Sequence, residues 1–182
     1  MEIATLQELA VHGLKDLYSA ENQILEALPK MAETATHPEL KNAFSQHLEE
    51  TRNQVRRLEQ IFQQLGQSPG GVTCKGMQGL IAEGQEVVES GGDPDVRDAW
   101  LIEAAQKVEH YEIAGYGTAC EYAKLLGQND ALQLLKQTIN EEEQTDEKLT
   151  QLAESELNPT AIQGAQEPEA ANDRRGGSKR SA

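Results

Sequence analysis

Apolar residues recur every three or four positions along four long stretches of the chain, with polar residues between them. This spacing places the apolar side chains of each stretch on one stripe of an α-helix. It predicts amphipathic helices over 5–34, 38–66, 95–127 and 131–158. Pro38 supports the start of the second helix, because proline fits the first turn of a helix.

The connections between these helices indicate how the helices are arranged. The first and last connections are short, which predicts two antiparallel helical hairpins. The connection over 66–94 is long and contains an apolar patch that predicts a short extra helix, made of Met77, Leu80, Ile81, Val87 and Val88. A crossover of this length makes the second and third helices parallel. We therefore expect an all-α, ferritin-like four-helix bundle over 1–157, followed by a disordered polar tail over 158–182.

Acidic and other metal-ligating residues interrupt the apolar stripe of every predicted helix. Each interruption falls near the middle of its helix, and Glu50 lies on the flank of its stripe. The middles of helices of similar length meet in one layer of a bundle. We therefore expect convergence of seven candidate metal ligands: Glu21, His47, Glu50, Glu109, Glu112, Glu142 and Asp146.

Burial of so many carboxylates is unfavourable unless their charge is neutralised. None of the four stripes contains Lys or Arg. Three arrangements remain: protonated acids, a splayed and hydrated bundle, or bound cations. Six carboxylates balanced by two di- or trivalent ions is the simplest, and oxygen ligands with some imidazole favour iron or manganese. The competing interpretation for any single acid is a solvated helix face.

Composition and charge exclude several classes of function. The 182 residues include 16 Lys and Arg against 31 Asp and Glu, a formal net charge of -15, which argues against a nucleic-acid partner. No apolar run approaches the roughly 20 residues that span a bilayer, so we expect no membrane partner. The start of the chain lacks the pattern of a signal peptide, and two widely separated cysteines do not form a disulfide framework. We expect a cytoplasmic protein with reduced thiols.

Four segments resemble the YciE/YciF family of ferritin-like proteins. The resemblance covers about Leu6 to Leu157, and the segments that carry it are Asp16–Gln23, His47–Thr51 with Gln54, Val108–Ile113 and Glu141–Asp146. It implies a ferritin-like fold, a homodimer, a carboxylate-bridged dinuclear metal centre and a bacterial stress-related role. It identifies neither a substrate nor a redox partner.

The sequence departs from the wider ferritin pattern at two positions. That pattern has Glu-x-x-His on the second and fourth helices. Here Glu50 is followed by Asn53 and Glu142 by Thr145, so both histidines are absent. His47, Gln54 and Asp146 lie close enough in sequence to substitute for them.

Two functional hypotheses follow from these observations. The first is a dinuclear iron or manganese protein that reacts with dioxygen or peroxide. Glu50 and Glu142 would bridge the ions, with Glu21 and Glu109 or Glu112 as terminal ligands. The second is a non-catalytic helical stress or interaction protein with a vestigial metal site. An iron-storage shell is disfavoured, because the sequence shows no inner-surface nucleation face.

Overall fold

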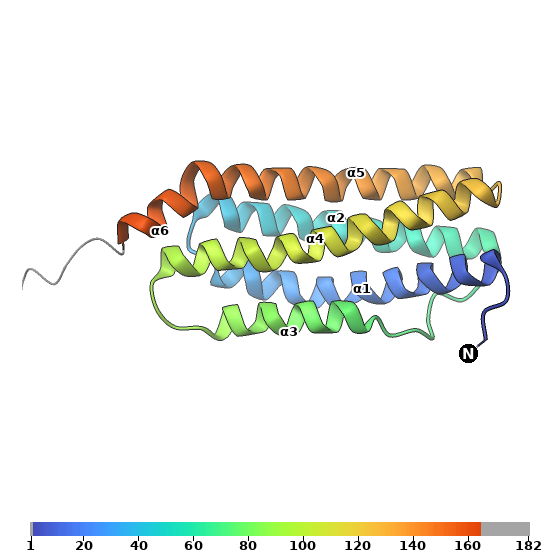
Figure 1. Ribbon diagram of the computed structural model, residues 1–182, viewed down its shortest axis with the longest axis horizontal. Coiled ribbons are helices and arrows are strands. Elements are labelled where there is room, and N and C mark those ends of the chain that lie inside the picture. Colours follow the sequence, from blue (N-terminus) through green and yellow to red (C-terminus); the bar gives the residue numbers. More distant parts are fainter. Residues whose placement is uncertain (1, 165–182) are drawn as a thin grey trace, which may run out of the picture.

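The structure is a computed structural model that describes residues 2–164. Four long helices form an antiparallel bundle, and Figure 1 shows them side by side: α1 (Leu6–Thr34), α2 (Pro38–Leu65), α4 (Pro94–Leu125) and α5 (Asn129–Leu152). A shorter helix, α3 (Lys75–Glu89), lies in the connection between α2 and α4. The predicted all-α, ferritin-like bundle with a helix in its crossover is confirmed.

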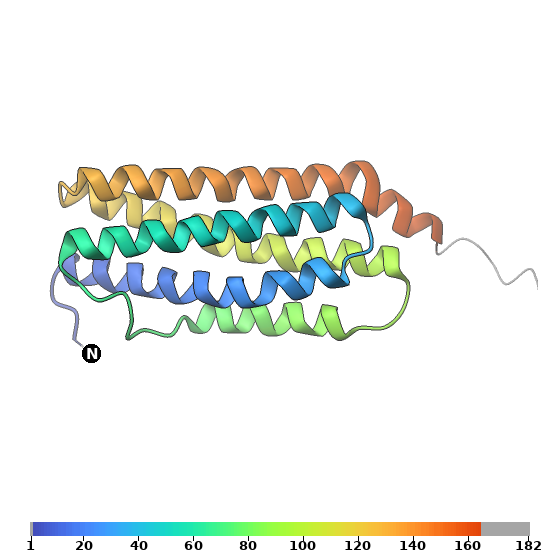
Figure 2. The ribbon, with the colours of Figure 1, turned by 180° about the vertical axis from the view of Figure 1, so that it is seen from behind.

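The crossover sets the topology of the bundle. The connection after α2 returns along the outside of the molecule, so that α2 and α4 run in the same direction (Figure 2). Helix α3 packs against α1 and α4 rather than inside the bundle. Among the described helices, none is both long and apolar enough to cross a membrane.

Local sequence signals fix the ends of these helices. Thr5 and Glu8 form a capping box at the start of α1, and the side chain of Asp93 accepts the N–H groups of the first turn of α4. At the end of α2, Gly66 adopts a left-handed conformation with φ of 63°, which glycine tolerates best.

Helix α3 is attached to the bundle at its first residues. Ser19 accepts the N–H of Cys74 at 3.0 Å, and the Cys74 thiol lies 2.9 Å from the hydroxyl of Tyr111. Tyr111 in turn donates a hydrogen bond of 2.7 Å to Asp16. These contacts join α1, α3 and α4 beside the middle of the bundle. Cys74 and Cys120 are both free thiols.

The helical region extends beyond its predicted end. A π-helical turn (Ala153–Leu157) follows α5 and continues into α6 (Asn158–Gly164). Residues 158–164, which the sequence analysis placed in the tail, are therefore helical. The reason is that Leu157 is buried in the apolar core, which holds this segment against the bundle. The rest of the predicted tail, 165–182, lies outside the described residues.

A polar layer divides the hydrophobic core into two clusters. One cluster contains Ile24, Phe44, Leu101 and Leu149, and the other lies beyond the middle of the bundle and contains Leu17, Leu58, Tyr116 and Leu135. The residues between them on the four helices are buried polar groups. The long apolar stripes therefore hold the bundle from both ends and leave its centre for polar chemistry.

Asp98 on α4 holds the connection between α1 and α2. It is completely buried, and its carboxylate accepts hydrogen bonds from the backbone N–H groups of Thr36 and His37 and from the Thr36 hydroxyl, at 2.6–3.0 Å. Hydrogen bonds to a charged group in a buried position are strong. Asp98 therefore holds the α1–α2 connection against α4 at this end of the bundle.

We expect Asp98→Ala to lower the free energy of unfolding by about 3 kcal/mol, because it leaves buried donors without a partner. Chemical denaturation of both proteins measures this difference. The matched control is Glu103→Ala on the same helix, where the side chain is 62% exposed. A loss for Asp98→Ala no larger than the loss for this control would contradict the assigned role.

Candidate metal centre

Three helices bring four candidate ligands together in the polar layer. His47 comes from α2, Glu109 and Glu112 come from α4, and Glu142 comes from α5. One ligand atom from each of these residues lies within 4.8 Å of the others, and all four side chains are buried. Glu109 and Glu112 are three residues apart, a spacing that puts both on one face of α4. The predicted convergence of these four residues is what the structure shows.

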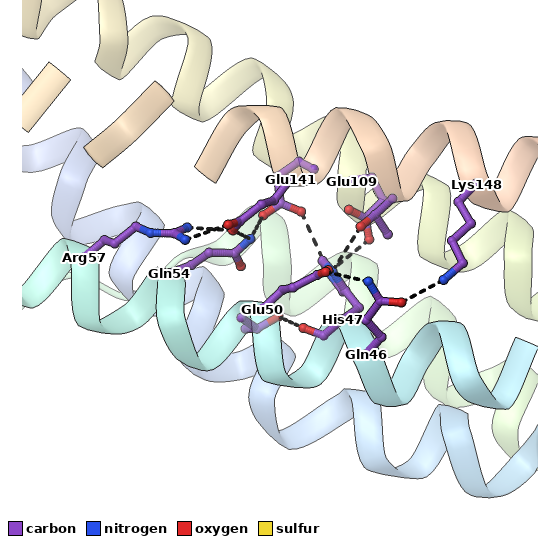
Figure 3. Close-up of polar contacts among 11 residues, drawn as sticks. Gln46, His47, Glu50, Gln54, Arg57, Glu109, Glu141 and Lys148 are labelled. Atoms are coloured by element: carbon purple, nitrogen blue, oxygen red, sulfur yellow. Dashed lines mark hydrogen bonds and ion pairs between the residues drawn. The ribbon is translucent and has the colours of Figure 1, made fainter. Parts of the chain in front are cut away.

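His47 lies at the centre of this group. Its Nε2 atom is 3.3 Å from an oxygen of Glu109 and 3.8 Å from an oxygen of Glu142 (Figure 3). Its Nδ1 atom is 3.4 Å from the hydroxyl of Thr145. The hydroxyl can accept a hydrogen bond from Nδ1–H, and in that tautomer the Nε2 lone pair is directed at the carboxyl groups.

Several buried polar atoms of this cluster have no hydrogen-bond partner among the described residues. They are His47 Nε2, Glu109 Oε2, both carboxylate oxygens of Glu112, Glu142 Oε2 and Glu21 Oε2. Buried polar atoms in folded proteins almost always have a partner. Electron-pair donors that converge without one are what a bound cation requires, so the residues present fit a metal.

The protonation equilibria of the carboxyl groups are strongly perturbed. Burial raises the pKa of Glu21, Glu109, Glu112 and Glu142, because removal from water disfavours the charged form. For Glu21, Glu109 and Glu112, repulsion from neighbouring carboxylates raises the pKa further. Without a cation, the cluster therefore favours protonated acids.

Glu21 on α1 is completely buried beside the four-residue cluster. The hydroxyl of Tyr116 donates a hydrogen bond to its Oε1 atom. Tyr116 therefore both packs in an apolar cluster and donates a hydrogen bond to a buried carboxylate. The Oε2 atom of Glu21 stays unpaired.

Glu50 and Asp146, two further candidate ligands, lie at the rim rather than in the cluster. The Glu50 side chain is 27% exposed, 3.6 Å from Nδ1 of His47, and this contact lowers its pKa. Asp146 is 21% exposed and lies 3.3 Å from Nε2 of His110. Four residues after Glu142, a side chain is rotated about 40° beyond a full helical turn, which directs Asp146 toward the surface.

Sequence reasoning missed a basic residue beside the carboxylate layer. Arg57 pairs with both oxygens of Glu141 at 2.6 Å, and Gln54 donates hydrogen bonds to Glu141 and Glu142 (Figure 3). Arg57 lies on the flank of the α2 stripe, so an analysis of the stripe alone omits it. Its spacing of three residues from Gln54 is the sequence signal that could have found it. Arg57 neutralises Glu141, and within residues 2–164 no Lys or Arg forms an ion pair with the four-residue cluster.

The bundle and its buried carboxylate–histidine cluster define the chain as a ferritin-like helical protein. Ferritin-like, diiron-carboxylate proteins from Bacillus anthracis strain Ames have a similar fold, with a TM-score of 0.64 at 18% identity, over 83% of this chain and 99% of theirs. At this low identity the similarity concerns the fold alone.

Residues 5–162 match a family described as a domain of unknown function, DUF892, and the chain belongs to this family. Protein YciF of Escherichia coli strain K12 is 46% identical over 162 residues, which cover 88% of this chain and 98% of that protein. The predicted resemblance is confirmed.

Two solved structures are also similar to this chain. The first is that of the E. coli stress protein YciF, with a TM-score of 0.83 at 46% identity, over 86% of this chain and 99% of that one. The second is that of YcfI, a putative structural protein from Rhodopseudomonas palustris, with a TM-score of 0.79 at 46% identity, over 82% and 95% of the two chains.

The raised carboxyl pKa values predict an unusual pH dependence for the metal-free protein. Between the unfolded and folded pKa values of these acids, the folded state binds more protons than the unfolded state, so stability falls as pH rises. We expect a lower melting temperature for chelator-treated protein at pH 8 than at pH 5. Glu112→Gln removes one of these acids, and we expect it to raise the melting temperature at pH 8 and to flatten the pH profile.

Glu121→Gln is the control for this experiment, because Glu121 lies on the same helix and its side chain is 55% exposed. We expect this variant to retain the wild-type pH profile. A wild-type melting temperature that rises steadily from pH 5 to pH 8 in the absence of metal would show that the acids are not desolvated.

Proposed function

We propose that this chain is a dinuclear iron or manganese protein that reacts with dioxygen or peroxide. The observation that carries the proposal is the set of unpaired, buried electron-pair donors in the polar layer. Oxygen ligands with one imidazole suit iron and manganese better than metals that prefer thiolates. Metal ions bound by these residues would supply the redox chemistry for reaction with an oxidant.

The balance of charge supports two ions rather than one. Glu21, Glu109, Glu112 and Glu142 are the buried carboxylates of the layer, and Arg57 already neutralises Glu141. Four negative charges match two divalent cations. His47, Glu109, Glu112 and Glu142 would hold the pair of ions, and Glu21 would add a ligand through its unpaired oxygen. Glu50 and Asp146 lie at the rim, where Glu50 would be a ligand only after movement of its side chain.

The surroundings of the layer control the electrostatics of this centre. Gln54 holds Glu142 in place by a hydrogen bond, and Tyr116 does the same for Glu21. Such contacts orient carboxylate ligands and adjust their basicity. The two apolar clusters on either side exclude water from most of the layer, which strengthens every charge interaction within it.

The biological setting that we propose is a bacterial response to oxidative or general stress. The support is the description of the relative YciF as a stress protein. We also propose a cytoplasmic homodimer. The exposed apolar side chains of Val96 and Trp100 on α4 are consistent with an interface.

Metal uptake tests the proposal directly. We expect chelator-treated protein to bind close to two Mn²⁺ or Fe²⁺ ions per chain under anaerobic conditions, as measured by calorimetry and elemental analysis. A ligand at 100 times its dissociation constant stabilises a protein by about 2.7 kcal/mol, so the melting temperature rises with metal concentration.

We expect Glu21→Gln to retain one ion, and Glu109→Ala combined with Glu142→Ala to retain none. An unchanged melting temperature after either metal is added would refute the proposal.

A non-catalytic structural role is the second candidate function. The observation in its favour is the description of the relative YcfI as a putative structural protein. The absence of both Glu-x-x-His histidines from this chain points in the same direction. The two candidates differ in reactivity: a metal-loaded protein that consumes hydrogen peroxide no faster than free metal supports the structural role. Equal survival under peroxide of cells with the wild type and with Glu50→Ala combined with Glu142→Ala would support it as well.

A further inference from the structure

A cavity of about 370 Å³ extends from the candidate metal centre to the surface beside α3. His47, Glu109 and Thr145 line it at the polar layer, and Lys30 and Gln85 line it farther along α1 and α3. The lining residues of α1 run from Ser19 to Met31, a distance of about 18 Å along the helix axis. The cavity is therefore elongated, and its volume lies within the usual range for small-molecule sites.

The walls of this cavity are mainly apolar and mostly aliphatic, with polar side chains such as Gln23, Glu26 and Gln78 between the apolar ones. All five bundle and crossover helices contribute, with side chains such as Ile24, Leu28, Ile81, Val88, Val108 and Leu149. Phe44 is the one aromatic residue among the lining residues of the described chain. Pockets for planar ring systems commonly offer aromatic faces for stacking, whereas an aliphatic wall selects for an aliphatic ligand by burial of its methylene groups.

Gly84 on α3 shows that part of this space is open. The residue is buried, and it lines the cavity. A Cβ atom added at this position would nevertheless meet no atom within 4 Å. Most buried positions in a protein are close-packed. The glycine therefore keeps open a volume that a side chain would fill.

A separate, smaller cavity lies at the rim of the polar layer. A cavity of about 170 Å³ between α2 and α5 is lined by Glu50, Glu141 and Lys148, and it shares Thr145 and Leu149 with the larger cavity. Cations and water fit this charged opening. The larger cavity has polar side chains too, among them Gln23, Glu26 and Gln78, but more than half of its lining residues are apolar.

We propose that the 370 Å³ cavity binds an unbranched aliphatic chain with a polar end group, and that it places this chain beside His47 and Glu109. Lys30 and Gln85 provide polar contacts for the end group at the mouth. The proposal names the substrate class of the metal centre and rests on the proposed function in that respect. Binding of the aliphatic ligand itself requires only the cavity.

Calorimetric titration with decanoate and with 1-decanol tests this proposal, on metal-free protein and on protein loaded with Mn²⁺. We expect saturable binding of one molecule per chain to both forms. Tighter binding of decanoate would identify the end group as a carboxylate, and tighter binding of the alcohol would identify it as a neutral hydroxyl. Either result supports the cavity assignment. No saturable binding of either compound to the wild type would overturn it.

Gly84→Leu provides the decisive variant, because its side chain would occupy the cavity without a backbone clash. We expect it to weaken decanoate binding by about tenfold or more, through the loss of space for several methylene groups. The matched control is Gly79→Leu on the same helix, at an exposed glycine that lies outside the lining and also has free space around it. Unchanged binding by Gly84→Leu, or an equal loss in both variants, would overturn the proposal.

Mn²⁺ affinity separates this proposal from the proposed function. We expect both glycine variants to retain the wild-type affinity for Mn²⁺. Binding of Mn²⁺ without binding of decanoate or 1-decanol by the wild type would overturn the cavity assignment and leave the metal function intact. Binding of decanoate or 1-decanol without any uptake of metal would overturn the proposed function and leave the cavity as a binding site.

Discussion

The cost of removing carboxylates from water is the constraint on which the rest of this structure depends. Four acids lie buried at the middle of the bundle, where each would carry a penalty of several kcal/mol if charged and unpaired. Two apolar clusters, one on each side of this layer, contribute hydrophobic burial that offsets the desolvation cost of the acids. Hydrophobic burial along the helix ends therefore holds together a centre that is unfavourable by itself. Such an arrangement is typical of functional sites, where local stability is given up for chemistry.

The polar layer is organised on two levels. His47, Glu109, Glu112 and Glu142 present free electron pairs to a common point. Around them, Gln54 and Tyr116 fix the orientation of neighbouring carboxylates, and Arg57 compensates the charge of Glu141. This division explains how a bundle with so few buried cations accommodates so many acids. The Glu-x-x-His histidines are absent, but His47, one turn before Glu50 on α2, brings an imidazole to the cluster.

Access to the layer differs between its two sides. A charged opening lies between α2 and α5, and an aliphatic cavity lies under α3. The crossover helix is therefore more than a connection, because it forms a wall of the cavity beside the polar layer. Its attachment through Cys74, Ser19 and Tyr111 holds that wall close to α4, the helix that provides Glu109 and Glu112. Family members that differ in α3 would be expected to differ in what they admit to the centre.

The sequence by itself determined the helices, their order, the parallel arrangement of α2 and α4 and the height of the polar layer. These features follow from local periodicity, turn residues and connection length, which act over short stretches of chain. Only the tertiary structure decided which acids converge, because this depends on the rotation of each helix about its axis. A rotation of a fraction of a turn separates buried Glu142 from Asp146, which is 21% exposed, on the same helix. Pairings between helices, such as Arg57 with Glu141 and Asp98 with the α1–α2 connection, were likewise beyond any periodic pattern, since they join residues far apart in the chain.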